Sequence, residues 1–337
     1  MWRRGNRQRF ALIHLQERQP AEMLSRLGYI KIFISLLCMA AIGLFSTPSW
    51  DLSIFSFGLQ NSSLCACQNC MTEGDPWFTA RMKASPQPFL SKTYEPLEND
   101  FKWWRRIQFE RRNFTVYKST LAKLFQIFPP VPDVVEHSPD HCTTCAVVGN
   151  SGNLNGSRYG PLIDFHDMVI RMNRGRTKGY EADVGSKTTH HVMYPNSATT
   201  LDNTTHLVFF PFKISHLLWL FNKFDPGENR SVNSKRIANK DLVMILNPAF
   251  IKYVHTTWLG KNGAYPSTGF LTVALSLQIC DEVSVFGFGA DKKGNWNHYF
   301  EILRQKKLRT GQHAGSHEYR LIQRLQEKKK IVFFKGF

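Results

Sequence analysis

Two histidine-containing segments near the C-terminus carry side chains suited to acid–base chemistry. His298 begins the string His298-Tyr-Phe-Glu301, and His313 precedes Glu318 by five residues. Imidazole has an ordinary pKa of about 6.5, so it can take or hold a proton near neutral pH. A zinc site at His313 and His317 would need a third ligand and lacks the HExxH order. We therefore expect these histidines to act on a substrate rather than on a metal.

Polar and glycine-rich segments follow several short apolar runs of the chain. Glycines let backbone amides approach an anion, and Asn and Ser side chains can add hydrogen bonds to it. These segments are weak evidence for a nucleotide-binding motif, because neither GxGxxG nor GxxxxGK followed by Ser or Thr occurs in the sequence. Each segment alone is also consistent with a turn or a helix cap, but together they indicate an anionic ligand. The residues are Asn150, Ser151, Gly152, Asn173, Tyr194, Ser267, Thr268, Gly269 and Gly289.

The sequence lacks the Asp-x-Asp string with which many sugar-nucleotide enzymes anchor a cation. The nearest string, Glu181-Ala-Asp183, is predicted to lie in a turn, where carboxylates commonly cap backbone amides. If the ligand is a sugar nucleotide, we expect histidine and backbone dipoles to neutralise its phosphate, without a metal.

Seven short apolar runs alternate with helix-like segments from residue 145 onward. Such runs are typical of strands buried on both faces of a parallel sheet. The sequence therefore predicts an α/β fold: a single domain with a mostly parallel seven-stranded sheet flanked by helices. Ligands of such sheets bind at the carboxyl ends of the strands. The predicted strands are 145–149, 168–172, 188–194, 207–212, 242–246, 283–289 and 331–336, and the predicted helices lie within 101–128, 214–224, 249–258, 268–279 and 316–327.

The chain of 337 residues is basic, with 43 Lys and Arg against 26 Asp and Glu and a formal charge of +17. The excess persists when the basic N-terminal 31 residues are set aside, which suggests an anionic partner: nucleic acid, acidic lipid or a sugar nucleotide. Nucleic acid is disfavoured as a partner because no zinc finger, helix-turn-helix or RNP-like string occurs.

An N-terminal apolar segment predicts attachment to a membrane. Residues 32–45 carry no charge, and basic residues precede them, so we expect a type II signal-anchor over 29–46 with a cytosolic tail over 1–28. A cleaved signal peptide is the alternative, since Ala40 and Ala41 are small. Residues 47–100, rich in Ser, Pro, Asn and Gly, are expected to form a stem, and 101–337 a lumenal catalytic domain.

Cysteines and glycosylation sequons agree with a lumenal location. The six cysteines beyond the predicted anchor favour disulfides, although the two Cys-x-x-Cys pairs could instead bind zinc. Five Asn-x-Ser/Thr sequons are candidate glycosylation sites. The cysteines are Cys65, Cys67, Cys70, Cys142, Cys145 and Cys280, and the sequons begin at Asn61, Asn113, Asn155, Asn203 and Asn229.

These motifs together resemble the animal sialyltransferase family. The family's large motif is similar to Cys145–Tyr194, its small motif to Leu246–Cys280, its third motif to His298–Glu301, and its very small motif to His313 with Glu318. The resemblance covers Phe101 to the C-terminus. The strings YPSTG and GFGADKKGNW and the first cysteine trio are most similar to the subgroup that transfers sialic acid to O3 of galactose in Galβ1-3GalNAc.

The resemblance implies a Rossmann-like fold of the GT-A variant type and a Golgi membrane enzyme that uses CMP-sialic acid, inverts configuration and needs no metal. It implies His313 as general base and His298 as the stabiliser of the leaving phosphate, with the polar and glycine residues given above binding the donor. It also implies acceptor contacts from Gln108, Tyr265 and Phe288, with galactose-terminated glycans of glycoproteins and glycolipids as partners. The implied disulfides are Cys145–Cys280, Cys65–Cys70 and Cys67–Cys142.

Two alternatives remain open from the sequence. One is the same fold acting on another galactoside, such as Galβ1-4GlcNAc or a glycolipid, and the other is a catalytically silent glycan-binding membrane protein. Three features depart from the family pattern: the Asn155 sequon falls inside the large motif, Asn297 stands where some relatives have a second histidine, and 225–239 matches poorly.

Overall fold

The computed structural model describes residues 66–67, 71, 74–135, 137–225, 237–302 and 311–336. The expected cytosolic tail and anchor and much of the expected stem lie outside the described residues. Residues from Ser62 onward form one compact unit, to which the following description refers. In the described part of the chain, no helix is long and apolar enough to cross a membrane.

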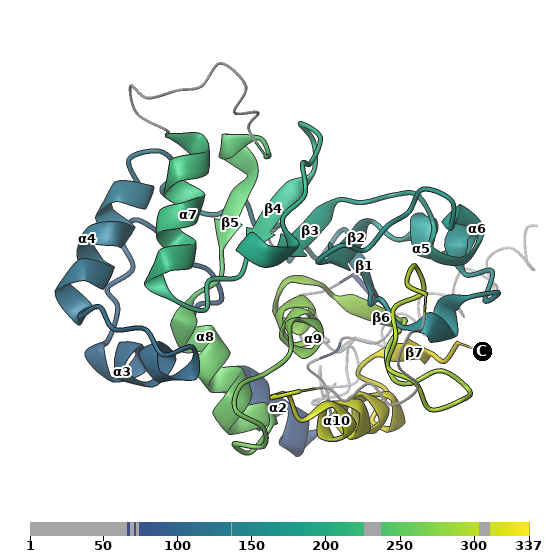
Figure 1. Cartoon of the computed structure of the whole chain (residues 1–337). Helices are drawn as coiled ribbons and strands as arrows, with labels where there is room; N and C mark the ends of the chain where they lie inside the picture. The colour runs from purple at the N-terminus through teal and green to yellow at the C-terminus, as the bar shows by residue number, and fades with distance from the viewer. Residues whose placement is uncertain are drawn as a thin grey trace, which may run out of the picture. The chain divides into compact units, whose positions relative to one another are not determined.

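A seven-stranded sheet forms the centre of this unit (Figure 1). Its strand order is β5-β4-β3-β2-β1-β6-β7, and every neighbouring pair runs parallel. The predicted α/β domain with seven strands is confirmed, and the sheet is wholly rather than mostly parallel. The strands are β1 (Thr144–Val148), β2 (Met168–Met172), β3 (His190–Met193), β4 (His206–Phe209), β5 (Val243–Ile245), β6 (Glu282–Phe286) and β7 (Val332–Phe334).

The strands are almost entirely buried because both faces of the sheet are covered, and a few buried polar residues, such as Arg171 and His190, lie among their apolar side chains. In β1, Cys145 and Val147 pack into the larger hydrophobic cluster, whereas Ala146 and Val148 pack into a second cluster. Successive side chains of a strand point to opposite faces, so this partition shows that each face has its own core.

Helices pack on the sheet, and further helices lie beyond its edge at β5. Helix α9 is apolar nearly throughout and packs on β1, β2 and β6, α10 packs on β7, and the pairs α3 with α8 and α4 with α7 gather near β5 (Figure 1). The α-helices are α2 (Pro76–Lys83), α3 (Glu98–Ile107), α4 (Phe114–Leu124), α5 (Gly160–Phe165), α6 (Glu181–Val184), α7 (Ile214–Phe224), α8 (Pro248–Tyr253), α9 (Thr268–Ile279) and α10 (Gly315–Glu327). Short 3-10 helices span Gly152–Leu154, Pro195–Ser197 and Lys240–Leu242, and a π-helix spans Val254–Trp258.

The helical segment predicted within 101–128 is two helices with a break between them. Phe109 takes a left-handed backbone conformation (φ 52°), which ends α3, and the Asn113 side chain accepts a hydrogen bond from Val116 N (3.0 Å) and begins α4. The predicted strand at 283–289 ends at Phe286, because Gly287 and Gly289 also have positive φ. The predicted element types hold, and local backbone turns set their true ends.

The packed domain begins before residue 101, earlier than the sequence predicted. Phe78, Phe89 and Leu90 are at most 2% exposed within the main core, although 47–100 was expected to be stem. Leu90 N donates to Ile245 O (2.8 Å), so this segment covers the outer edge of β5. A few apolar residues in a Pro- and Ser-rich stretch give little periodic signal, yet they complete the core.

Two disulfides join distant parts of the described chain. Cys145 in β1 bonds to Cys280 at the end of α9, and Cys67 bonds to Cys142. These are pairings that the resemblance implied, and Cys65 and Cys70 lie outside the described residues. Cys142 and Cys145 therefore do not form a zinc pair. Among the described residues, the group close enough to hold a metal is Cys67, Cys142 and Glu282, whose two sulfurs are bonded to each other.

Three of the predicted glycosylation sequons can be located on the surface. Asn113, Asn155 and Asn203 are exposed, whereas Asn61 and Asn229 lie outside the described residues. Asn113 uses its Oδ1 as a helix cap, which leaves its Nδ2, the atom that carries an N-linked glycan, outside that contact. Glycosylation at these positions stays a prediction.

Candidate active site

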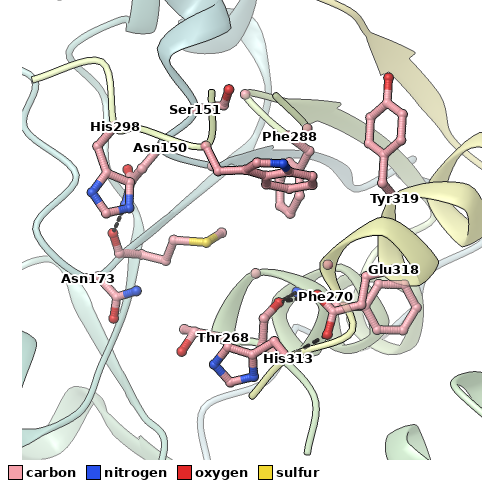
Figure 2. Close-up of a pocket in the computed structure, with 18 of the residues that line it drawn as sticks. Asn150, Ser151, Asn173, Thr268, Phe270, Phe288, His298, His313, Glu318 and Tyr319 are labelled. Atoms are coloured by element: carbon pink, nitrogen blue, oxygen red, sulfur yellow. Dashed lines mark hydrogen bonds between the residues drawn. The ribbon is translucent and has the colours of Figure 1, made fainter. Parts of the chain in front are cut away.

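A cavity of about 370 Å³ lies where the direction of strand order reverses (Figure 2). After β1 the chain adds β2 to β5 on one side, and then crosses to place β6 on the other side of β1. Open α/β sheets bind ligands at this switch point, outside the carboxyl ends of the strands. The cavity is lined by Gly149, Asn150, Ser151, Met172, Asn173, Tyr194, Ser267, Thr268, Gly269, Phe270, Gly287, Phe288, Gly289, Trp296, Asn297, His298, His313, Gly315, Glu318, Tyr319 and Ile322.

The loops after β1 and β6 are bonded to each other and form one side of the cavity. Ser151 N donates to Gly287 O (3.0 Å), and Asn153 Nδ2 donates to Phe288 O (2.8 Å). A Cβ on Gly149 would lie 2.3 Å from Gly287 O, so the two backbones approach as closely as they do because residue 149 is glycine. The cavity wall is therefore set by backbone contacts between segments far apart in sequence.

Two asparagines present amide groups at the cavity. Asn150 Nδ2 donates to Met172 O (3.0 Å), and Asn173 sits in a left-handed conformation (φ 55°). The backbone of Asn173 is fixed by His191, because His191 Nε2 donates a hydrogen bond to the carbonyl oxygen of Asn173 (2.7 Å). Asn173 Oδ1 is buried and has no hydrogen-bond partner among the described residues. A buried acceptor without a partner costs about 1–3 kcal/mol, so this atom is suited to a donor group of a ligand.

His298 lies beside these asparagines (Figure 2). Its Nδ1 is 2.8 Å from Glu301 Oε1, and its ring stacks on Phe300 with centroids 5.2 Å apart. Burial raises the pKa of Glu301, but hydrogen bonds and the charge of His298 outweigh it and place that pKa below its usual value. The carboxylate thus accepts from Nδ1, and Nε2 is the ring nitrogen left for a ligand.

The segment that carries His298 is fixed by strand-like pairing with the loop after β1. Tyr299 N donates to Asn150 O (2.9 Å), and Gly152 N donates to Asn297 O (2.8 Å). This is the contribution of Gly152, which was predicted to bind a ligand but does not line the cavity. It positions the histidine segment instead.

His313 lies across the cavity from His298 (Figure 2). Its Nδ1 is 3.1 Å from the backbone oxygen of Tyr265, and the two rings meet edge to face with centroids 4.9 Å apart. A carbonyl oxygen can only accept, so Nδ1 of the neutral ring carries the hydrogen and donates it. Nε2 then holds the lone pair, which is the state that a general base requires.

Glu318 holds the beginning of α9, which faces the cavity. Its carboxylate accepts from Ser267 N (2.8 Å) and from Ser267 Oγ (2.6 Å), and Ser267 Oγ accepts from Phe270 N (3.0 Å). The carboxylate of Glu318, a residue that is 6% exposed, therefore fixes the serine that caps α9, whose N-terminal amides favour an anion.

Comparisons with known proteins agree with this geometry. The profile of glycosyltransferase family 29 (sialyltransferase) matches residues 89–330. The chain belongs to glycosyltransferase family 29. It is 43% identical over 286 residues to CMP-N-acetylneuraminate-beta-galactosamide-alpha-2,3-sialyltransferase 1 of Gallus gallus, which covers 81% of this chain and 82% of the relative. To the protein of the same name in Sus scrofa it is 44% identical over 282 residues, with 81% and 82% covered.

Solved structures show the same sialyltransferase fold. The crystal structure of a mammalian sialyltransferase in complex with Gal-beta-1-3GalNAc-ortho-nitrophenol matches with a TM-score of 0.71 at 42% identity, covering 81% of this chain and 100% of that one. A crystal structure of a mammalian sialyltransferase matches with a TM-score of 0.73 at 43% identity, covering 81% and 99%. The family and the enzyme class predicted from the motifs are thus confirmed.

The structure brings most of the predicted site residues of this sialyltransferase together. Gln108 and Tyr265 do not line the cavity but lie next to it, with Gln108 Nε2 donating to Tyr265 Oη (2.8 Å), and Tyr265 contacting His313. The predicted residues that line the cavity are Asn150, Ser151, Asn173, Tyr194, Ser267, Thr268, Gly269, Phe288, Gly289, His298 and His313.

Several lining residues of the sialyltransferase were not predicted as site residues. Trp296 and Asn297 directly precede His298, so their position beside a predicted ligand was an available signal. Tyr319 and Ile322 share one face of α10 at a spacing of three residues, which also fits ordinary core packing. Met172 and Phe270 belong to strand and helix patterns and carried no sequence signal of their own.

Glu318→Gln is expected to lower the free energy of unfolding of the sialyltransferase by about 2 kcal/mol. The glutamine amide keeps one acceptor oxygen but lacks the negative charge that strengthens both hydrogen bonds. Its NH2 group replaces the second acceptor oxygen and faces a hydrogen-bond donor of Ser267. Glu327→Gln is the matched control, because Glu327 lies exposed on the same helix. Denaturant unfolding of both variants measures the difference, and equal stability of the two would show that the Glu318 contacts contribute little.

Proposed function

We propose that the protein transfers sialic acid from CMP-sialic acid to O3 of galactose in Galβ1-3GalNAc carried by glycoproteins and glycolipids. The observation that carries the proposal is the placement of His298 and His313 on opposite sides of one cavity whose other walls offer amides suited to a nucleotide (Figure 2). The names of the chicken and pig relatives, both β-galactosamide α2,3-sialyltransferases, support the substrate assignment.

In this proposal the donor occupies the side of the cavity formed by the two asparagines and α9. Asn173 Oδ1 accepts a hydrogen bond from the cytidine or ribose, and Asn150 positions Met172 O beside it. The phosphate faces His298 Nε2 and the backbone amides of Thr268 and Gly269, because the amide of Ser267 already donates to Glu318. An anion at the N-terminus of a helix of this length is stabilised by the helix dipole.

The reaction is a single inverting displacement. As galactose O3 forms a bond to the anomeric carbon of sialic acid, its proton passes to His313 Nε2. The bond from that carbon to the phosphate oxygen breaks, and its electron pair leaves with CMP. His298, hydrogen-bonded to the phosphate, stabilises the charge that develops there. Base and leaving-group ligand face opposite sides of the reacting carbon, as an inversion requires.

The acceptor galactose is placed by Gln108, Tyr265 and Phe288. The amide and the phenol, already bonded to each other at 2.8 Å, offer groups that can bridge sugar hydroxyls. Phe288 lines the cavity and offers an aromatic face for the apolar side of galactose.

The proposal includes the membrane topology. Residues 29–46 span the Golgi membrane once as a type II anchor, 1–28 face the cytosol, and the segment after the anchor forms a stem that leads to the packed domain in the lumen. The basic residues before the charge-free segment support this orientation. The fold is of the Rossmann-like GT-A variant type, which agrees with the parallel sheet and its switch point.

Incubation of the purified protein with CMP-sialic acid and a panel of galactosides tests the function. We expect sialic acid on O3 of Galβ1-3GalNAc, with much weaker transfer to Galβ1-4GlcNAc. Preference for another galactoside would replace the acceptor assignment, and binding without transfer would identify a silent glycan-binding protein.

Transfer is expected to keep nearly all of its rate in excess EDTA. Among the described residues that line the cavity, Glu318 is the one carboxylate, and both of its oxygens accept hydrogen bonds from Ser267. The phosphate is therefore expected to rely on histidine and backbone amides. Rates with EDTA, and with EDTA followed by manganese, measure this; loss of activity that manganese restores would contradict it.

A further inference from the structure

A second groove, of about 550 Å³, adjoins the active site on the side of α3. It is separate from the cavity described above and has no part in the proposed reaction. We call it the α3 groove, and it is lined by Trp103, Arg106, Ile107, Phe109, Ala264 and Gln312.

The α3 groove is continuous with the proposed acceptor site through the chain itself. Ala264 precedes Tyr265, Gln312 precedes His313, and Ala264 N donates to Gln312 O (2.9 Å). Gln108, which lies between two groove residues, bonds to Tyr265. A galactose whose O3 reaches His313 passes Gln108 and Tyr265, so the carrier of the glycan emerges beside the groove.

Phe109 is a solvent-exposed aromatic residue whose backbone conformation is fixed by its neighbours. It is 86% exposed and has a φ of 52°, a conformation that is unfavourable for a bulky residue. The next residue, Glu110, fixes the turn that contains Phe109. Glu110 N donates to Arg105 O (2.8 Å), and the buried Glu110 carboxylate accepts from Ile214 N (2.9 Å). Strain held in place by surrounding contacts, with an apolar ring kept in water, points to a ligand that covers the ring.

The groove also carries positive charge. Arg106 lines it and is exposed, and Arg111 is exposed on the following turn. Neither guanidinium forms a salt bridge with a carboxylate of the described residues, whereas neighbouring Arg112 pairs with Glu110 at 3.0 Å. A cation next to the exposed Phe109 ring suits a polypeptide that offers both carboxylates and apolar groups.

We propose that the α3 groove binds the polypeptide that carries the acceptor disaccharide, with a preference for acidic residues beside the glycosylated Ser or Thr. Arg106 binds their carboxylates, Gln312 can bond to peptide groups, and Phe109 and Trp103 pack on side chains. An acyl chain of a glycolipid would leave the polar groups of the groove unused. This inference rests on the proposed function, because it concerns the carrier of the same acceptor.

The test compares four acceptors that share Galβ1-3GalNAc: the free disaccharide, the disaccharide on a short peptide with flanking Asp and Glu, the same peptide with flanking Lys, and the disaccharide linked to ceramide. The variants are Phe109→Ala and Arg106→Glu. Phe165→Ala is the matched control, because Phe165 is 87% exposed on α5 and lines neither cavity. The full-length protein in detergent is used throughout.

We expect each variant to raise KM for the acidic glycopeptide about five- to tenfold, while kcat/KM for the free disaccharide stays within about twofold. Arg106→Glu should also reverse the preference between acidic and basic peptides. Equal losses on peptide and free disaccharide, no loss on either, or a loss confined to a ceramide-linked acceptor would overturn the inference. If the unaltered protein transfers to none of these acceptors, the proposed function fails instead.

Discussion

His313→Ala is expected to reduce transfer of sialic acid by about three orders of magnitude while CMP binding is kept. A sugar hydroxyl is a poor nucleophile near neutral pH, so it needs a base at the moment the new bond forms. Tyr265 O accepts a hydrogen bond from His313 Nδ1, so in the neutral ring Nε2 carries the lone pair that takes the proton. Initial rates at saturating donor, with CMP affinity measured by calorimetry, separate the loss of a base from the loss of binding.

His298→Ala serves as the comparison variant, and His317→Ala as the control. Without His298 both CMP binding and transfer should weaken, because that side chain is proposed to contact the phosphate in the donor and in the leaving group. His317 lies on α10 one turn after His313 and does not line the cavity, so its replacement should leave the rate near that of the unaltered protein. Transfer by His313→Ala at a near-normal rate would refute the base assignment, even if the family's activity is present.

Removal of the Cys145–Cys280 disulfide is expected to lower the free energy of unfolding by about 5 kcal/mol. The bond closes a loop with a sequence separation of 135 residues, and in the chain-entropy model a loop of this length restricts the unfolded chain by that amount. The double variant Cys145→Ala with Cys280→Ala avoids an unpaired thiol in the core. Denaturant unfolding measures the change.

The same disulfide also affects the active site through the elements that it joins. It links β1, whose end leads to Asn150, with the end of α9, whose beginning carries Ser267. We therefore expect the double variant to lose donor affinity at temperatures where it is still folded. Unchanged stability of the double variant, or a Cys145 thiol found by peptide mapping of the unreduced protein, would contradict the prediction.

Local sequence patterns predicted the buried elements well. The expected segments 168–172, 214–224 and 268–279 coincide with β2, α7 and α9. Each is a strongly apolar run in which burial follows one regular pattern from end to end: either all of its faces are buried, or one face is. Patterns failed where one residue changes the course of the backbone, as at Phe109, or where scattered apolar residues complete a core, as at Phe78 and Phe89.

The predicted donor residues were found because parallel strands align their carboxyl ends. Asn150 and Asn173 follow neighbouring strands, so the sheet register alone brings them to one edge. By contrast, the bond from Glu318 to Ser267 and the bond from Gln108 to Tyr265 join residues 51 and 157 positions apart. No local pattern carries these contacts, because they join α10 and the end of α3 to the segment that begins α9.

The sequence by itself determined the chemistry that is available: two histidines in recognisable motifs, amide groups after strand ends, the sialyltransferase family and the parallel α/β class. These features can be predicted from the sequence because they depend on residue type, on the spacing of residues along the chain and on the order of the motifs. The tertiary structure alone decided which ring nitrogen of His313 holds the lone pair, that Glu318 fixes the start of α9, and that a groove with Phe109 and Arg106 adjoins the acceptor side. Each of these depends on a partner brought close by packing of distant segments, and such contacts exist only once the chain has folded.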